Sequence, residues 1–393
     1  MRSLPAGDLL DAWAETVEAF LDPTSPERGA LDPDLARLCR LSPEGLAAGL
    51  EAVLGGVRRE PAAALFTAAE GKTAPEEPVL VVLASNLPAL AVQPLLPALA
   101  LRRPVLLKSP SAEPLFASAF LAALIRREPR LEGCLSAAAW PGGDTLLEAP
   151  VLAAAGTILA YGDAPALADL EKRAPGKVIG YGPKTSLAVV GEGIDLRDVA
   201  EGLARDIALF DQRGCLSVVA VYTAGDADAL AARLEEALED RARAWPPGPV
   251  DPAVQAGVQQ IRLEAEMRGL RSPRLPLAAG TVLVDPDPAF RPSPGLRTVR
   301  IHPLRDLGRI SVLLSPWQGR LQGAALAEDA WNLVSKLEAL GISRCAAPGD
   351  LQSPDARWHN GGIDPLEALT SRSSPPRPAS PTAQLPERPS RSG

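Results

Sequence analysis

The chain has 393 residues, of which 46% are hydrophobic and 22% charged, and its formal net charge is −8. This composition predicts a globular protein of two or three domains with a substantial core, and it excludes a fibrous chain. Lysine and arginine are interspersed with acidic residues throughout, so we expect no nucleic-acid partner.

Residues 1–70 have a helical pattern broken by polar and Pro-rich stretches such as DPTSPERGALDPD. We predict a helical N-terminal section that serves packing and carries no chemistry of its own. Its first residues, MRSLPAGDLLDAWAETVEAFLD, lack the basic stretch and long apolar core of a secretory signal. A cytoplasmic protein is therefore expected.

From residue 71 to 183, short β-rich runs alternate with longer Ala/Leu-rich runs. The β-rich runs are VLVVLAS, PVLLKSP, CLSAAAW, GTILAYG and GKVIGYG. This alternation predicts a mainly parallel sheet with helices on both faces. The most apolar stretch, 79–101, contains Asn86, Gln93 and three prolines, so we predict a buried strand and helix there and no membrane span.

Ligands of parallel sheets bind beyond the carboxyl ends of the strands. The residues that follow the predicted strands are therefore the first candidates for a binding site. They include Asn86, Lys108, the turn at 142–144, and Gly162.

Residues 184–350 form a second predicted α/β section. The stretch DLRDVAEGLARDIALFDQRG is expected to be one helix, with an Asp at its start and a Gly at its end. Cys215 follows that glycine and precedes the β-branched run VVAVYTAG. A charged helix, DADALAARLEEALEDRARAW, and the strand-like runs TVLVD and RTVRIHP follow.

The end of the chain divides into a closing segment, 351–370, and a final stretch, 371–393. That stretch, SRSSPPRPASPTAQLPERPSRSG, is rich in Ser, Pro and Arg. Such a composition cannot bury a core, so a disordered tail is predicted.

The four cysteines are far apart and form no CxxC pair, so neither a metal site nor a disulfide framework is predicted. A free cysteine is most often a small buried hydrophobic residue. Cys215 differs because the polar stretch DQRG precedes it, whereas Cys134 and Cys345 have apolar surroundings. We therefore select Cys215 as the candidate nucleophile.

Four stretches resemble, in the same order, landmarks of the aldehyde-dehydrogenase superfamily and, more narrowly, of the bacterial luminescence-type fatty acyl-CoA reductases. They are ASNLPALAVQPLLPALALRRPVLLKSP, ILAYGD, YGPKTSLAVV and DQRGCLS. The stretch ISRCAAPGDLQSPDARWHNGGIDPLEAL is similar to the closing segment of the acyl-CoA reductases. The resemblance implies a Rossmann-type cofactor domain at 71–183 and an α/β catalytic domain at 184–350.

The resemblance also implies catalytic roles for two residues. Cys215 would attack the thioester carbonyl, expel CoA and hold the acyl group until hydride arrives. Asn86 would donate its amide to the oxyanion, together with the backbone N–H of Cys215. The alternative for Asn86 is a turn-forming residue after a strand.

By the same resemblance, Lys108 would contact the adenosine ribose or phosphate of a nicotinamide cofactor; an exposed lysine that closes a strand is the alternative. NAD-preferring members often carry a glutamate where this chain has Ser111, and a carboxylate there would repel a 2′-phosphate. NADPH is therefore expected, with NADH as the alternative. Gly162 would lie near the pyrophosphate, with Asp163 replacing the family's serine, and Ser85 is a further expected cofactor contact.

Hydrolytic aldehyde dehydrogenases have a glutamate four residues before the turn lysine, and this chain has Gly180 before Lys184. Without a base to activate water, the acyl-enzyme would persist until CoA or hydride acts on it. A CoA-linked reductase is therefore favoured over an acid-forming dehydrogenase, and the resemblance implies a medium or long acyl chain. The family's later Glu-x-Phe cofactor motif is not evident, and Arg297 and Thr298 stand roughly in its place.

The histidines, His302 and His359, have no flanking signature, and a lone histidine is more often structural. His359 matches the closing segment and is expected on the substrate side without a catalytic role. Two other functions stay open: an acyl-phosphate reductase of the same fold, and a non-catalytic scaffold. An acyl-donating partner enzyme and a homo-oligomer are expected from the resemblance alone.

Overall fold

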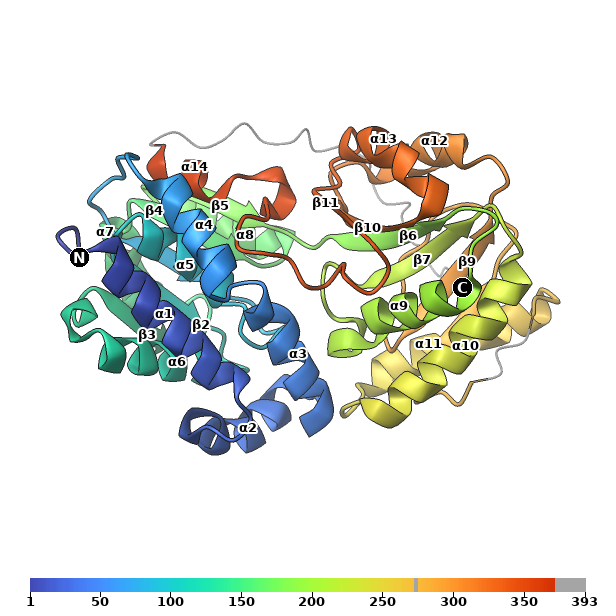
Figure 1. Ribbon diagram of the computed structural model, residues 1–393, viewed down its shortest axis with the longest axis horizontal. Helices are drawn as coiled ribbons and strands as arrows, with labels where there is room; N and C mark the ends of the chain where they lie inside the picture. Colours follow the sequence, from blue (N-terminus) through green and yellow to red (C-terminus); the bar gives the residue numbers. More distant parts are fainter. Residues whose placement is uncertain (272–274, 372–393) are drawn as a thin grey trace, which may run out of the picture.

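The computed structural model describes residues 1–271 and 275–371, which form two parallel sheets covered by helices (Figure 1). The predicted α/β fold is confirmed, with the sheet boundary between residues 181 and 185. The predicted disordered tail lies outside the described residues except for Ser371. No helix in the described part of the chain is long and apolar enough to cross a membrane.

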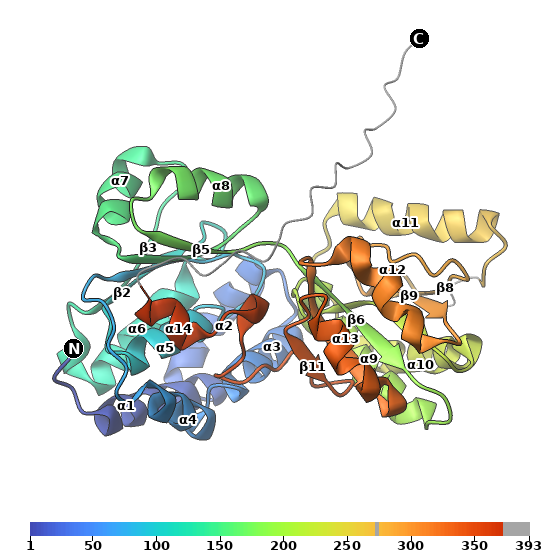
Figure 2. The ribbon, with the colours of Figure 1, turned by 90° about the horizontal axis from the view of Figure 1, so that it is seen from above.

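The first sheet has the strand order β3-β2-β1-β4-β5, and all its pairs are parallel. Helices α7 and α8 cover one face, and α5 and α6 cover the other (Figure 2). The strand order reverses between β1 and β4, which is where parallel sheets of this type bind ligands. The elements are β1 (Val79–Val82), α5 (Val92–Ala100), β2 (Val105–Ser109), α6 (Leu115–Arg127), β3 (Leu135–Ala139), α7 (Thr145–Ala154), β4 (Thr157–Tyr161), α8 (Ala164–Arg173) and β5 (Lys177–Tyr181).

The N-terminal section forms an additional helical layer on α5 and α6. An aromatic cluster of Trp13, Phe20, Phe116 and Phe120 joins this layer to α6, with ring centroids 5.2 to 5.7 Å apart. These rings are fully or almost fully buried, so the layer extends the hydrophobic core of the first sheet. Its helices are α1 (Ala6–Leu21), α2 (Pro26–Cys39), α3 (Pro43–Gly55) and α4 (Arg59–Ala69).

The second sheet has the strand order β11-β10-β6-β7-β9-β8 and is also parallel. Helices α9 and α10 cover one face, and the short helices α12 and α13 cover the other (Figure 1). Helix α11 contacts the edge strand β8. The elements are β6 (Thr185–Val190), α9 (Leu196–Ala208), β7 (Val218–Thr223), α10 (Ala227–Ala244), α11 (Pro252–Met267), β8 (Thr281–Val284), β9 (Thr298–Pro303), α12 (Ile310–Leu314), β10 (Leu321–Ala327), α13 (Val334–Glu338) and β11 (Arg344–Ala346).

The closing segment returns from β11 to the first sheet and ends in α14 (Pro365–Thr370), which packs against α5. Two buried cations bind the C-terminal end of this helix. Lys177 Nζ donates to Ala368 O at 2.8 Å, and Arg103 Nη1 donates to Leu369 O at 2.9 Å. Because the last carbonyls of a helix lack partners within it, this contact fastens the closing segment to the first sheet.

The helix predicted to run as far as Gly214 ends earlier. The Asp195 side chain caps α9 as expected, accepting from the Arg197 N–H, but α9 stops at Ala208. Three residues with left-handed backbone follow, at 210–212. Tertiary contacts of these residues override the local helical pattern, so the part of the prediction that covered 209–214 was wrong.

Candidate active site

A cavity of about 650 Å³ lies between the two sheets. The carboxyl ends of β1, β4 and β5 form one wall, and the segments that enter β6 and β7 form another. Four of the predicted site residues line this cavity: Ser85, Asn86, Gly162 and Cys215. Helix α3 adds Val53, so the N-terminal section reaches the site instead of serving packing alone.

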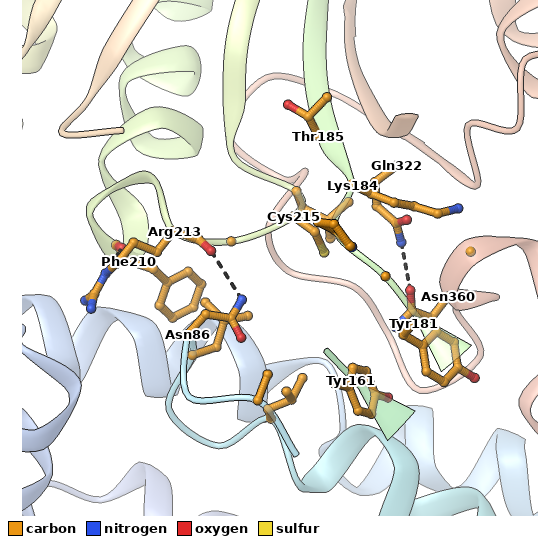
Figure 3. A pocket seen from close by; sticks show the side chains of 18 of the residues that line it. Asn86, Tyr161, Tyr181, Lys184, Thr185, Phe210, Arg213, Cys215, Gln322 and Asn360 are labelled. Carbon is orange, nitrogen blue, oxygen red and sulfur yellow. Dashed lines mark hydrogen bonds between the residues drawn. The ribbon is translucent and has the colours of Figure 1, made fainter. Parts of the chain in front are cut away.

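Cys215 lies just before β7 and is half-buried, and it lines the cavity among the other labelled side chains (Figure 3). The Ser186 hydroxyl donates to its carbonyl oxygen at 2.8 Å, which ties the nucleophile loop to β6. Burial raises the pKa of the Cys215 thiol to about 11, and the nearby Lys184 ammonium acts in the opposite direction. The resting thiol is therefore protonated at neutral pH.

Asn86 reaches Cys215's loop from the first sheet. Its Nδ2 donates to Arg213 O at 3.2 Å, two residues before the cysteine (Figure 3). A side-chain amide has two N–H groups, so the second remains for an oxyanion. The bond also links the strand-end loop of β1 to the loop before β7.

Tyr161 and Tyr181 end β4 and β5 and line the cavity as a stacked pair, with ring centroids 4.7 Å apart. Burial raises the pKa of both phenol groups, which stay neutral over the physiological range. On the second sheet, Gln322 Nε2 donates to Asn360 Oδ1 of the closing segment at 2.8 Å. This bond joins the second sheet to the closing segment within the lining of the cavity.

Lys108 and Ser111 do not line the cavity. Lys108 is the residue before the last of β2, next to β1, and its Nζ lies 5.8 Å from the centre of the Trp140 ring. Burial lowers the pKa of Lys108, and the side chain is 8% exposed, which contradicts the alternative of an exposed surface lysine. Ser111 Oγ donates to Trp140 O at 3.5 Å. Both residues therefore lie, like Ser85, at the carboxyl ends of the strands of the first sheet, but they contact Trp140 and not the cavity.

The N-terminus of α8 differs from an ordinary anion site. Asp163 is its N-cap, and Asp163 Oδ1 already accepts from the Ala166 N–H at 2.9 Å. Pro165 has no N–H to offer. A carboxylate thus lies where the resemblance would put a pyrophosphate, and few N–H groups of the first turn remain for a ligand.

The structure also places the two histidines and Arg297, which the sequence had singled out. His302 is fully buried, stacks on Tyr222 at 5.0 Å and has Nδ1 2.7 Å from Asp287 O, which is a structural role. His359 does not line the cavity, although its neighbours Trp358 and Asn360 do. Arg297 is buried in an ion pair with Asp211, so it does not face the cavity.

Several polar or aromatic residues that line the cavity were not assigned to the site from the sequence, among them Tyr161, Tyr181, Gln322 and Asn360, and Lys184 was noted only as the turn lysine. The chain has only three tyrosines, and two of them end strands of the first sheet. That pattern was available in the sequence. Gln322 and Asn360 gave no local signal, because only the path of the closing segment brings them to the site.

The sequence matches a known protein family over most of its length. Residues 35–372 match the family model described as acyl-CoA reductase (LuxC). The chain belongs to this family. The match covers both sheets and the closing segment, and therefore all residues that line the cavity.

Curated members of similar sequence are long-chain acyl-protein thioester reductases. The protein from Aliivibrio fischeri is 26% identical over 257 residues, 61% of this chain and 54% of the relative. Long-chain acyl-protein thioester reductase 2 from Photobacterium leiognathi is 23% identical over 330 residues, 80% of this chain and 67% of the relative. This chain thus spans about half and about two thirds of their respective lengths.

Solved structures confirm the aldehyde-dehydrogenase fold. Aldehyde dehydrogenase 21 from Physcomitrella patens superposes with a TM-score of 0.72 at 14% identity, covering 93% of this chain and 85% of the other. An NAD-dependent benzaldehyde dehydrogenase from Corynebacterium glutamicum gives 0.68 at 16% identity, covering 94% and 85%.

The raised pKa of Cys215 predicts how its reactivity changes with pH. Between about pH 7 and pH 10, alkylation of Cys215 by iodoacetamide should accelerate about tenfold per pH unit, because the thiolate is the reactive form. Lys184→Met should slow the reaction, since loss of the cation raises the pKa of the thiol further. Peptide mass spectrometry separates Cys215 from the other cysteines. Lys72→Met, at an exposed position, is the matched control, and a rate plateau below pH 8 would contradict the prediction.

Proposed function

We propose that this protein reduces a medium- or long-chain acyl-CoA thioester to the aldehyde with NAD(P)H, through an acyl group bound to Cys215. The observation that carries the proposal is that Cys215 and Asn86, from different sheets, meet in one cavity beside the β1–β4 switch point. The named activity of the relatives, acyl-protein thioester reduction, supports a thioester substrate.

The first half-reaction transfers the acyl group. Cys215 Sγ attacks the thioester carbonyl carbon, the bond to the CoA sulfur breaks, and CoA leaves as a thiol that carries the proton released by Cys215. The carbonyl oxygen gains negative charge in this step. Asn86 Nδ2 and the Cys215 N–H are the donors for that charge.

The second half-reaction reduces the bound acyl group, and a bound nicotinamide cofactor supplies the hydride. The same two donors stabilise the oxygen as it again becomes negative. Collapse of this adduct breaks the carbon–sulfur bond, releases the aldehyde and returns Cys215 as a thiolate, which regains a proton. Both steps therefore require the same position of Asn86 relative to Cys215.

Protection from water explains why reduction is favoured over hydrolysis. Gly180 stands where hydrolytic relatives of the fold carry their base, and a Cβ at this position would lie 3.1 Å from a Leu167 methyl group. Among the described residues that line the cavity, Asp163 is the only carboxylate, and it is engaged in capping α8. No side chain there is arranged to activate water beside Cys215.

The residues of the first sheet fit a nicotinamide dinucleotide at most positions. Ser85 and Gly162 flank the switch point, where the nicotinamide half would lie next to Cys215. Lys108 and Ser111 would hold the adenosine ribose, and the lack of a carboxylate at residue 111 favours NADPH over NADH. The first turn of α8 is the exception, because the Asp163 carboxylate opposes a diphosphate. The first sheet is accordingly our proposed cofactor domain, and the second is the proposed catalytic domain.

The acyl chain would occupy the apolar part of the cavity. Its lining includes Val53, Leu87, Leu90, Phe210 and Trp358, which come from both sheets, the N-terminal section and the closing segment. An acyl-protein thioester is the second candidate substrate, because the similar protein from Aliivibrio fischeri is a long-chain acyl-protein thioester reductase. We further propose a cytoplasmic enzyme that receives its acyl group from a partner enzyme.

The direct test mixes the protein with NADPH and acyl-CoAs of increasing chain length. NADPH oxidation and release of free thiol should proceed in equal amounts, and Cys215→Ala should abolish both while circular dichroism stays unchanged. Phosphate release from an acyl phosphate, with no reaction of any acyl-CoA, would instead favour the acyl-phosphate reductase. A folded protein that is inactive with all these donors would support the scaffold.

Asn86→Ala should lower kcat about 10²- to 10³-fold, because one oxyanion donor is lost in both half-reactions. KM for acyl-CoA should change little, since the ground-state carbonyl gains less from this donor than the transition state does. Asn332→Ala removes an exposed amide outside the cavity and is the control. Equal kcat values for the two variants would show that Asn86 only shapes the turn.

Asp163→Ser should tighten NADPH binding, because a charge at the N-terminus of α8 would no longer repel the diphosphate. The expected gain is about two- to fivefold in Kd, as for a charge worth about 0.3–1 kcal/mol at a helix end. Cofactor fluorescence measures binding without turnover. Asp226→Ser alters the equivalent cap of α10, outside the cavity, and should leave Kd unchanged. A weaker affinity in Asp163→Ser would contradict the proposed repulsion.

A further inference from the structure

Three successive residues before Cys215 have left-handed backbone. The φ angles of Phe210, Asp211 and Gln212 are 56°, 50° and 63°. This region is unfavourable for residues other than glycine, and most of all for a bulky one such as phenylalanine. The surroundings must therefore impose this conformation, because the local sequence does not favour it.

Phe210 is held by packing against α3. A Cβ at Gly49 would lie 2.6 Å from the Phe210 ring, so the absence of a side chain at residue 49 lets the ring lie directly on the helix. The ring is 2% exposed. This contact fixes the first residue of the left-handed run.

Asp211 is held by a buried ion pair. Arg297 Nη2 lies 2.7 Å and Nε 3.2 Å from Asp211 Oδ1, and Arg297 is 1% exposed. Arg297 Nη2 also donates to Trp245 O at 2.8 Å, and Asp211 Oδ2 accepts from the Gly248 N–H at 3.0 Å. The pair thus joins the nucleophile loop to the start of β9 and to the segment after α10.

Gln212 is held by hydrogen bonds to the backbone of two strands. Its Nε2 donates to Val218 O at 2.8 Å and to Thr298 O at 2.9 Å, and its Oε1 accepts from the Thr298 N–H at 2.8 Å. Val218 and Thr298 begin β7 and β9. The loop is therefore bound to the first residues of the neighbouring strands β7 and β9, and the carbonyl of the next residue, Arg213, accepts from Asn86.

We propose that the Asp211–Arg297 ion pair positions the nucleophile: it holds the left-handed run so that the Cys215 thiol and the Arg213 carbonyl face Asn86. Arg297 acts only through the loop, because it does not line the cavity. This inference deepens the proposed function, since it takes Cys215 as the nucleophile. It assigns a positioning role to Arg297, which stands roughly where the family's Glu-x-Phe cofactor motif would be expected.

The variants separate charge from backbone preference. Asp211→Asn removes the charge but keeps a side chain that tolerates left-handed backbone. Arg297→Met removes the cation and its hydrogen bonds. Arg297→Lys keeps the positive charge but loses the planar group that contacts Asp211 through two nitrogens and also reaches Trp245 O. The matched control is Arg268→Met, because Arg268 makes a similar pair with Asp285 at 2.9 and 3.1 Å. Asp285 follows β8, at the opposite end of the parallel sheet from Cys215.

The readouts are the rate of Cys215 alkylation by iodoacetamide at fixed pH, kcat, KM for acyl-CoA, and the urea midpoint. Arg297→Met should lower kcat about 10- to 100-fold, as misplacement of a reacting group by about 1 Å does, and should change the alkylation rate, because the exposure and surroundings of the thiol change with the loop. KM should stay within about twofold of wild type, because the loop positions the reacting atom rather than the acyl chain. Arg297→Lys and Asp211→Asn should fall between wild type and Arg297→Met.

Arg268→Met should lower the urea midpoint less than Arg297→Met does, because Arg268 is 34% exposed, and should keep its alkylation rate and kcat. If Arg297→Met and Asp211→Asn match this control in alkylation rate and kcat, the ion pair is only structural and the inference is wrong. Should Arg297→Met fail to fold, Asp211→Asn and Arg297→Lys decide by the same comparison. Alkylation requires no acyl substrate, so a protein that reduces no acyl-CoA would still report on the loop.

Discussion

The site depends on one backbone constraint: the chain reaches Cys215 through three left-handed residues. Each such residue costs about 1–2 kcal/mol relative to right-handed backbone, and the run persists because Phe210, Asp211 and Gln212 each have a fixed partner. A regular helix continued to Gly214 would carry the thiol in another direction. Strain held by several independent contacts is typical of positions where a reactive group must be fixed.

The cavity exists because the carboxyl ends of strands in the first sheet face the beginnings of strands in the second sheet. The first sheet supplies strand-end loops at its switch point, the second supplies the entries to β6 and β7, and the closing segment completes the wall with Asn360. The Asn86–Arg213 hydrogen bond and the contacts of Lys177 and Arg103 with α14 hold these parts together. In the mechanism that we propose, acyl transfer and reduction would share one set of donors, and the described lining of the cavity holds no carboxylate other than Asp163, which caps α8.

The sequence was sufficient for the elements and for part of the site. Buried β-branched runs identified most strands, and because parallel strands end at one edge, Asn86, Lys108, the turn at 142–144 and Gly162 could be grouped before the structure was known. Of these, Asn86 and Gly162 line the cavity. The end of α9 could not be predicted, since Arg297 and Gln212's partner Thr298 lie more than eighty residues away in sequence. Val53 and Asn360 were missed for the same reason: only the packing of α3 and the return of the closing segment bring them to Cys215.

The measurement that tests the central claim most directly is the intact mass of the protein after mixing with a long-chain acyl-CoA in the absence of reduced cofactor. The account predicts a mass increase of one acyl group, located on Cys215, removed by hydroxylamine as a thioester is, and discharged as aldehyde when NADPH is added. An unchanged mass, or an adduct that persists in Cys215→Ala, would contradict a covalent intermediate on this residue.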